Sequence, residues 1–322
     1  MAKYLVTGGA GFIGCNLARH VLAKGHQVVV LDNFSTGHRR NLEEILDNVE
    51  MVEGDVRDRE TVDRAVAGCS AIFHEAALPS VSRSVEDPVS SHDVNVNGTI
   101  TLLEAARAAG VKRVVFAGSS SAYGETVESP KHEGMVPTPI SPYAASKVAC
   151  EVYLRAYASV YGMETLTLRY FNVFGPYQDP EGAYAAVIPA WVSRILAGSA
   201  PIVYGDGEQS RDFCYIQNVC EANWLAAHAP ADACDGTAVN IACNHATSLN
   251  QILLKLKELL AVEVEAEYTD PRAGDVKDSL ADISLARETI GYKPGVYFEE
   301  GLTMAIDWYR RNLRPKRGAG PA

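Results

Sequence analysis

The chain has 322 residues, a hydrophobic fraction of 47% and a formal net charge of −11. A chain of this length can bury a large core and is expected to form two lobes. Its negative charge argues against a nucleic acid or an anionic membrane as a partner. No apolar run approaches the ~20 residues of a membrane span. No signal peptide precedes the first predicted strand, so we expect a cytoplasmic protein.

The seven cysteines and eight histidines indicate neither disulfides nor a metal site. The cysteines form no Cys-x-x-Cys pair, which is typical of free thiols in a reducing cytosol. The histidines do not combine with cysteines at the spacing of metal ligands, so no catalytic metal is expected. His74 lies beside a predicted strand end and is interpreted as a structural histidine.

Residues 3–25 have the pattern of a strand, a glycine-rich turn and a helix. An apolar run leads into three glycines, and an amphipathic stretch then continues to Lys24 and stops at Gly25. Such glycines allow a tight turn and a close approach of the backbone to a phosphate. Backbone N–H groups and the helix dipole would then face a pyrophosphate. The residues expected to do this are Gly8, Gly11, Phe12, Ile13 and Gly14.

A second apolar run, 28–31, ends at Asp32, which follows Gly14 by 18 residues. An acid at this place can bind the ribose hydroxyls of adenosine and repel a 2′-phosphate, which favours NAD over NADP. The alternative is a glycine-rich loop with an unrelated surface acid. The order of strand, helix, second strand and terminal aspartate favours the dinucleotide site.

Strand-like and helix-like runs alternate through the first half of the chain. Further apolar runs occupy residues 49–52, 71–73, 111–117 and 165–168. Helical stretches separate them near residues 59–67, 86–109 and 142–161. This alternation predicts an α/β fold, a Rossmann-type doubly wound parallel sheet with helices on both faces.

Ligands of such sheets bind beyond the carboxyl ends of the strands. Polar or small residues follow the predicted strands at these places, and their clustering at one sheet edge predicts the ligand site. They are Asp32, Asp55, Val56, Ala76, Ala77, Ser119, Ser120, Ser121 and Asn172.

Tyr143 and Lys147 lie four residues apart in a predicted helix, so their side chains share one face. A free phenol ionises near pH ~10 and is a poor base at neutral pH. A nearby ammonium favours the phenolate. The pair is therefore a candidate general base for a substrate hydroxyl. The alternative is a chance pair on a solvated helix. The dinucleotide pattern and the run of serines at 119–121 favour the catalytic interpretation.

The pattern changes after residue 176. The first lobe is expected to comprise residues 1–176 and about 212–245, since 212–229 has the pattern of a strand and a helix that return to the sheet. Shorter elements with many Gly and Pro turns predict a smaller α/β substrate-binding lobe from about 177–211 and 246–312. The basic, Gly- and Pro-rich residues 313–322 are expected to be a disordered tail.

Several stretches together resemble the extended short-chain dehydrogenases/reductases of the nucleotide-sugar epimerase and dehydratase group. They are Thr7–Gly14, Asp32–Gly37, Asn95–Thr99, Ser119–Gly124, Ser141–Lys147, Leu168–Pro176, Gly205–Phe213 and Arg272–Asp275. The resemblance implies NAD as cofactor and a UDP-sugar as substrate. It adds the NAD-binding candidates Asn33, Ser35, Thr36, Gly37 and Asn95. It implies that the substrate contacts Ser80, Ser119, Ser120, Ser121, Tyr143, Asn172, Arg211, Arg272, Asp275 and Ser279.

The serine run separates the reactions of this group. In similar enzymes the residue at Ser119 binds the sugar 4-OH beside the catalytic tyrosine. The 4,6-dehydratases have an acidic pair at the next two positions, where this chain has Ser120 and Ser121. The resemblance therefore implies C4 epimerisation through a 4-keto intermediate, with Tyr143, Lys147 and Ser119 as catalytic residues. A non-catalytic NAD-binding sensor would be expected to lack one of these three.

Similarity also bears on the sugar and on assembly. The position of Ser279 borders the C2 substituent in similar epimerases, where a tyrosine restricts the pocket to plain hexoses. A serine implies room for an N-acetyl group, as in bacterial UDP-N-acetylglucosamine 4-epimerases, and UDP-glucose remains a second substrate. UDP-glucuronate 4-epimerase and UDP-glucuronate decarboxylase are the alternatives. Helices near 89–109 and 144–161 pair across a twofold axis in relatives, which implies a homodimer through a four-helix bundle.

Overall fold

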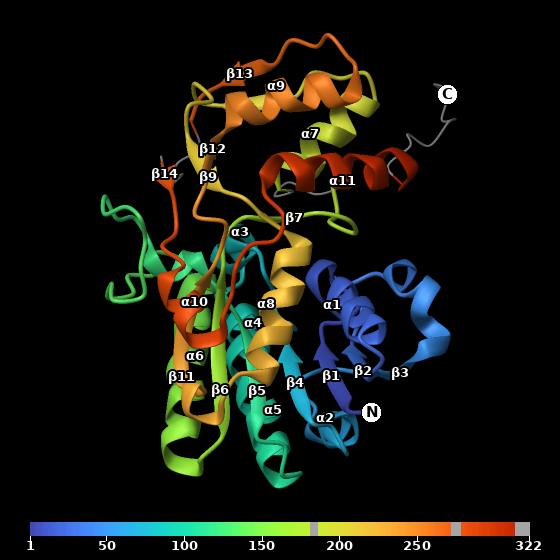
Figure 1. Cartoon of the computed structure of the whole chain (residues 1–322), viewed down its shortest axis with the longest axis vertical. Helices are drawn as coiled ribbons and strands as arrows, with labels where there is room; N and C mark the ends of the chain where they lie inside the picture. Colours follow the sequence, from blue (N-terminus) through green and yellow to red (C-terminus); the bar gives the residue numbers. More distant parts are fainter. Residues whose placement is uncertain (181–185, 272–277, 313–322) are drawn as a thin grey trace.

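A parallel sheet of seven strands forms the centre of the protein (Figure 1). The structure is a computed structural model and describes residues 1–180, 186–271 and 278–312. The order of the strands across the sheet is β11-β6-β5-β4-β1-β2-β3. Their bounds are β1 (Lys3–Thr7), β2 (Gln27–Asp32), β3 (Val49–Glu53), β4 (Ala71–His74), β5 (Arg113–Ser119), β6 (Glu164–Tyr170) and β11 (Asp235–Ile241). The predicted Rossmann-type α/β fold is confirmed.

Helices cover both faces of this sheet because side chains of a buried parallel strand are apolar in both directions. In β2, Val28 and Val30 join the core on one face, and Val29 and Leu31 join the core on the other. The first core includes helices α1 (Phe12–Ala23) and α8 (Ile216–His228). The second includes helices α2 (Arg59–Val66), α5 (Gly98–Ala108) and α6 (Pro142–Tyr161).

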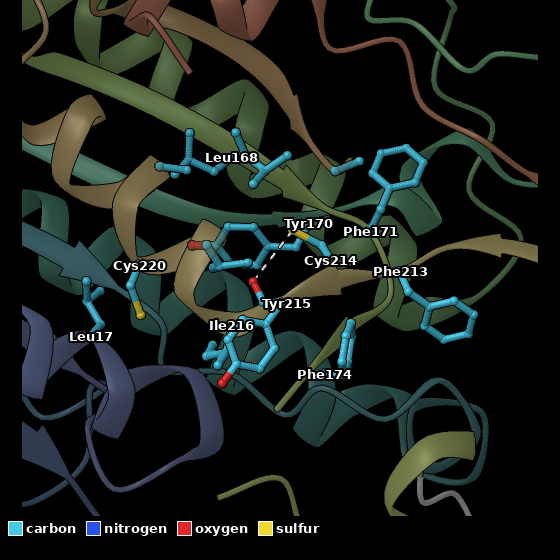
Figure 2. Close-up of a cluster of buried hydrophobic side chains, with 14 of the residues drawn as sticks. Leu17, Leu168, Tyr170, Phe171, Phe174, Phe213, Cys214, Tyr215, Ile216 and Cys220 are labelled. Carbon is cyan, nitrogen blue, oxygen red and sulfur yellow. Dashed lines mark hydrogen bonds between the residues drawn. The ribbon is translucent and has the colours of Figure 1, made fainter. Parts of the chain in front are cut away.

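The first core continues beyond the sheet into the second half of the chain. Figure 2 shows Leu17 of α1 and Cys220 of α8 in the same cluster as Leu168 of β6. Aromatic side chains extend the cluster upward: the ring of Phe174 lies 5.7 Å from that of Phe298, between centroids. The cluster therefore ties the sheet to the elements that follow residue 176.

Shorter elements form the remainder, most of them above the carboxyl edge of the sheet in Figure 1. They are β7 (Val173–Phe174), α7 (Val187–Leu196), β8 (Ile202–Tyr204), β9 (Ser210–Asp212), β10 (Cys214–Tyr215), β12 (Ala246–Ser248), α9 (Leu249–Leu260), β13 (Glu267–Thr269), β14 (Asp278–Ser279), α10 (Ser284–Ile290) and α11 (Phe298–Asn312). Strand β9 lies between β12 and β14, whereas α10 packs against β11 of the large sheet. The division into two lobes stays a prediction, and the expected tail at 313–322 lies outside the described residues.

The segment before α5 contains two features that the sequence analysis did not predict. The helical stretch near 86–109 is interrupted: α4 (Pro88–His92) leads through a π-helical turn at Asp93–Asn97 into α5. Residues 81–86, which the sequence analysis assigned to no element, form helix α3 (Val81–Glu86). The Ser80 hydroxyl caps α3 by accepting from the Arg83 N–H.

Helix α6, which carries the tyrosine–lysine pair, is fixed to the sheet by a buried ion pair. The guanidinium of Arg169 in β6 donates to both oxygens of the Glu151 carboxylate, at 3.0 and 2.7 Å. Both side chains are at least nine-tenths buried. All seven cysteines are free thiols, as predicted, and all seven are also buried. None of the helices within the described ranges is long and apolar enough to cross a membrane.

Candidate active site

The glycine-rich turn between β1 and α1 has no room for larger residues. Gly8 adopts a φ of +65°, and a Cβ there would lie 2.8 Å from the backbone of Ala76. A Cβ on Gly14 would collide with the carbonyl oxygen of Gly8. The turn therefore brings the start of α1, at Phe12 and Ile13, against the sheet edge, where its N–H groups can face a phosphate.

Asp32 ends β2, and its carboxylate binds the backbone of the glycine turn and of the segment that follows β2. Its carboxylate accepts from the Ala10 N–H at 2.8 Å and from the Phe34 N–H at 2.7 Å. The side chain is buried, and burial raises its pKa while the two N–H groups act in the opposite direction. Each carboxylate oxygen retains a further lone pair, so the group can still accept from ribose hydroxyls.

Nine of the predicted NAD-binding residues line one pocket at the carboxyl edge of the sheet. They are Gly8, Asp32, Asn33, Ser35, Thr36, Asp55, Val56, Ala76 and Ala77. Asn33 bridges the pocket wall, since its amide donates to Asp55 at 2.9 Å and its carbonyl accepts from the Ser35 N–H. Arg57 lowers the pKa of the Asp55 carboxyl to about 2.

Two predicted NAD-binding residues have mainly structural contacts. Gly37 packs against Ala10, where a Cβ would lie 2.8 Å from the backbone. The buried Asn95 side chain accepts from the Leu78 N–H at 2.8 Å and donates to the Ser146 hydroxyl at 2.9 Å. It thereby fixes the pocket segment at Leu78 to α6. The pocket, the glycine turn and the remaining donors described below fit NAD.

Tyr143 and Lys147 lie on one face of α6, as predicted. The Lys147 ammonium is buried and donates to the carbonyl of Ala117 in β5 at 2.8 Å. Its Nζ lies 5.9 Å from the centroid of the Tyr143 ring. Two of the three ammonium donors remain for a ligand.

The start of α6 depends on two serines. Ser141 caps the helix by accepting from the Ala144 N–H at 3.1 Å. Ser84, which the sequence analysis did not single out, is fully buried and accepts from the Tyr143 N–H at 3.0 Å. Ser84 comes from α3, so this short helix fixes the position of the tyrosine.

The serine run lies at the carboxyl end of β5. The Ser119 hydroxyl accepts from the backbone N–H and the hydroxyl of Ser121, at 3.2 and 2.8 Å. It caps the 3-10 turn at Ser120–Tyr123. Ser119 therefore turns its oxygen toward Ser121, and its own proton remains available to a further acceptor.

The predicted substrate residues of the second half meet on β9 and β14. In the ladder Ser279 lies opposite Arg211, and Ser279 is buried. Asn172 has a φ of +31° and donates to the Asp212 carbonyl at 3.3 Å. The predictions for Arg272 and Asp275 lie outside the described residues.

Two titratable residues stand at the carboxyl end of β4: His74 ends the strand and Glu75 follows it. His74 is structural, as predicted, because its ring nitrogens bind the hydroxyls of Thr7 and Thr99, at 2.7 and 2.9 Å. Glu75 was not singled out. Its carboxyl accepts from the Tyr170 hydroxyl at 2.8 Å, and Asn223 donates to the same hydroxyl. The carboxyl is enclosed although part of the residue reaches the surface, and burial raises its pKa to about 7.

Comparison with known proteins identifies the class of this fold and site. Residues 4–242 match the NAD dependent epimerase/dehydratase family, and the chain belongs to it. The UDP-glucose 4-epimerase of Mycolicibacterium smegmatis is 39% identical over 317 residues, 96% of this chain and 98% of that protein. At the level of the family, the chain is therefore an NAD-dependent UDP-sugar 4-epimerase, an isomerase.

Solved structures agree over nearly the whole chain. A UDP-N-acetylglucosamine 4-epimerase from Methanobrevibacter ruminantium, in complex with UDP-N-acetylmuramic acid, has a TM-score of 0.91 and 37% identity, with 96% of this chain and 98% of that chain covered. A UDP-glucose 4-epimerase of Thermus thermophilus in complex with NAD has a TM-score of 0.86 and 37% identity, with 96% and 99% covered.

The raised pKa of Glu75 predicts a pH-dependent stability. The folded protein holds this proton more tightly than the unfolded chain, whose carboxyl has its ordinary pKa of 4.5. Stability is therefore lost as pH rises from the unfolded pKa through about 7. We expect Glu75→Gln to remove this loss. The free energy of unfolding of the variant relative to the wild type should therefore rise by up to about 3 kcal/mol between pH 4 and pH 8.

Urea unfolding at several pH values measures the effect. The exposed Glu128→Gln is the matched control, because it removes the same charge from the surface and should leave the pH dependence of the wild type. Parallel curves for wild type and Glu75→Gln would contradict the assignment.

Proposed function

We propose that the protein interconverts UDP-N-acetylglucosamine and UDP-N-acetylgalactosamine, with UDP-glucose and UDP-galactose as a second pair of substrates. The observation that carries this choice is the small, buried Ser279, opposite Arg211 in the β9–β14 ladder. In the proposed sugar pocket, a hydroxymethyl side chain leaves space beside C2 that a larger side chain would fill. The similar structure from Methanobrevibacter ruminantium, named a UDP-N-acetylglucosamine 4-epimerase, supports the same choice.

The proposed chemistry assigns each part of the site a separate task. Bound NAD supplies a reversible hydride acceptor. Tyr143 takes the proton of the sugar 4-OH and later returns it to the C4 oxygen of the turned sugar, with Ser119 bridging. Lys147 uses its free donors to hold the nicotinamide ribose and favours the phenolate of Tyr143.

The nucleotide must stay anchored while the keto sugar turns. We assign that role to Asn172, Arg211, Arg272 and Asp275, since an arginine binds a diphosphate with bidentate, charge-assisted bonds. Ser120 and Ser121 carry no carboxylate for an elimination, which favours epimerisation over dehydration.

Removal of the base tests the mechanism. Tyr143→Phe is expected to fold and to retain NAD, but to lose about 100- to 10,000-fold in kcat because the proton acceptor is gone. Ser119→Ala should lose less, because the base remains. Turnover of UDP-N-acetylglucosamine, followed by proton NMR without added NAD, measures both. Near-normal turnover of Tyr143→Phe would exclude the assigned role.

Enlarging Ser279 tests the choice of sugar. Ser279→Tyr adds a ring where the acetamido group must lie, at about 1–3 kcal/mol, or about one to two decades in rate. The loss should fall on UDP-N-acetylglucosamine and spare UDP-glucose, so the ratio of the two kcat/KM values changes. Ser279→Ala is the matched control and should preserve that ratio. An equal fall for both substrates would remove the main support for an N-acetylated substrate.

We also propose a homodimer through a four-helix bundle of α6 and the helical stretch 89–109, which begins in α4. These helices pack on each other, and each exposes apolar side chains: Val89 of α4 is 76% exposed and Val152 of α6 is 64% exposed. Exposed apolar side chains on adjacent helices are expected at a partner surface.

Light scattering should give about twice the monomer mass of 34.7 kDa. Val152→Lys places a charge in the proposed interface and should shift the protein toward the monomer. Val127→Lys, at a fully exposed residue away from both helices, is the control. A wild type that stays monomeric over a wide concentration range would contradict the proposal.

A further inference from the structure

Lys131 is a buried lysine whose backbone is hydrogen-bonded to the segment that follows Ser279. In the sequence Lys131 lies between the serine turn and α6, and the residue is only 4% exposed. Its backbone pairs with the segment after β14: the Lys131 N–H donates to the Leu280 carbonyl at 2.8 Å, and the Asp282 N–H donates to the Lys131 carbonyl at 2.9 Å. These bonds form a β-bridge between Lys131 and Ala281.

The acids around this segment are occupied by backbone groups. Asp212 accepts from the N–H groups of Cys243 and Ala281, at 2.9 and 3.3 Å. Glu133 accepts from the Asn240 N–H at 2.6 Å, and Asp282 accepts from the Ser284 N–H at 2.8 Å. Within ranges 1–180, 186–271 and 278–312, no carboxylate forms an ion pair with the Lys131 ammonium.

The charged group that acts on Lys131 is another cation. Burial and the nearby Arg211 guanidinium both lower the pKa of the lysine. An unpaired buried charge is costly, and a like charge close by adds to the cost. This arrangement is expected where an anion completes the site, as for the cationic groups that bind phosphates.

The register of the strands brings the two cations to one place. Arg211 of β9 lies opposite Ser279, and Lys131 lies opposite Ala281, two residues further along the same segment. Side chains two residues apart on an extended segment point to the same face. Lys131 and Arg211 therefore flank the segment that bears the proposed sugar gate.

We propose that Lys131 binds the diphosphate of the nucleotide sugar together with Arg211. The inference rests on the proposed function of Arg211 and Ser279 as parts of the substrate pocket. A diphosphate provides several anionic oxygens within a small volume, so it can engage both a planar guanidinium and a compact ammonium. Lys131 then contributes to binding of the substrate rather than to proton or hydride transfer.

Calorimetric titration of the full-length NAD-loaded protein with UDP tests this role. Lys131→Met removes the charge but keeps an unbranched apolar side chain, and it should weaken the binding of UDP roughly 10- to 100-fold. Lys131→Arg keeps the charge and should retain most of the affinity. Glu133→Gln is the matched control, because it neutralises a neighbouring charge with a backbone partner of its own. Lys131→Gln serves as a second neutral variant, and melting temperatures confirm that each protein is folded.

The substrates then separate the competing explanations. We expect KM to rise similarly for UDP-N-acetylglucosamine and UDP-glucose, with kcat changed only a few-fold, and the Kd of UDP-glucuronate to rise by the same factor. A loss confined to UDP-glucuronate, with unchanged UDP binding, would overturn the proposal in favour of a sugar carboxylate as the ligand. Unchanged UDP affinity with a lower melting temperature would overturn it in favour of a structural role. UDP binding needs no turnover, so it can be measured whether or not the protein is an epimerase. A wild type that binds UDP but epimerises no UDP-hexosamine would refute the proposed function, and the role of Lys131 could still be tested by UDP affinity.

Discussion

The bond from the Lys147 ammonium to the Ala117 carbonyl is the contact on which the site geometry depends. It ties α6 to β5 at 2.8 Å inside the protein, and it places Tyr143 one turn earlier, above the end of the same strand. A buried ammonium needs such a partner, because burial without one is unfavourable. The Arg169–Glu151 pair fixes α6 to the neighbouring strand β6, about one turn further along. Two attachments to adjacent strands leave the helix little freedom to rotate or slide.

The parts of this site that could be predicted are those whose signal is local in the sequence. The glycine turn, Asp32 and the Tyr143–Lys147 spacing each follow from a short pattern with a direct geometric meaning. The parallel sheet followed from the alternation of strand-like and helix-like runs. The hydrogen bond that the Asp32 carboxylate accepts from the Ala10 N–H was not predicted, since it depends on how the turn at Ala10 folds back over β2.

Residues whose role comes from distant contacts could not be found in this way. Ser84 reaches Tyr143 across 59 positions, and Glu75 reaches Tyr170 across 95. Lys131 meets the segment at Leu280 only because the loop after the serine turn pairs with it. A lysine, a serine or a glutamate in isolation carries no such signal, because most residues of these types are exposed.

The distribution of charge explains how an acidic protein can serve an anionic substrate. The net charge of −11 weakens any general attraction for anions, so the binding energy has to come from cations placed within the site. In the proposed arrangement Lys147 serves the cofactor end, while Arg211 and Lys131 serve the diphosphate end. The two groups belong to different elements, α6 on one side and the β9–β14 ladder with its bridged loop on the other. A sugar held only by its diphosphate can turn between them and present either face to Tyr143, which is what inversion at C4 requires.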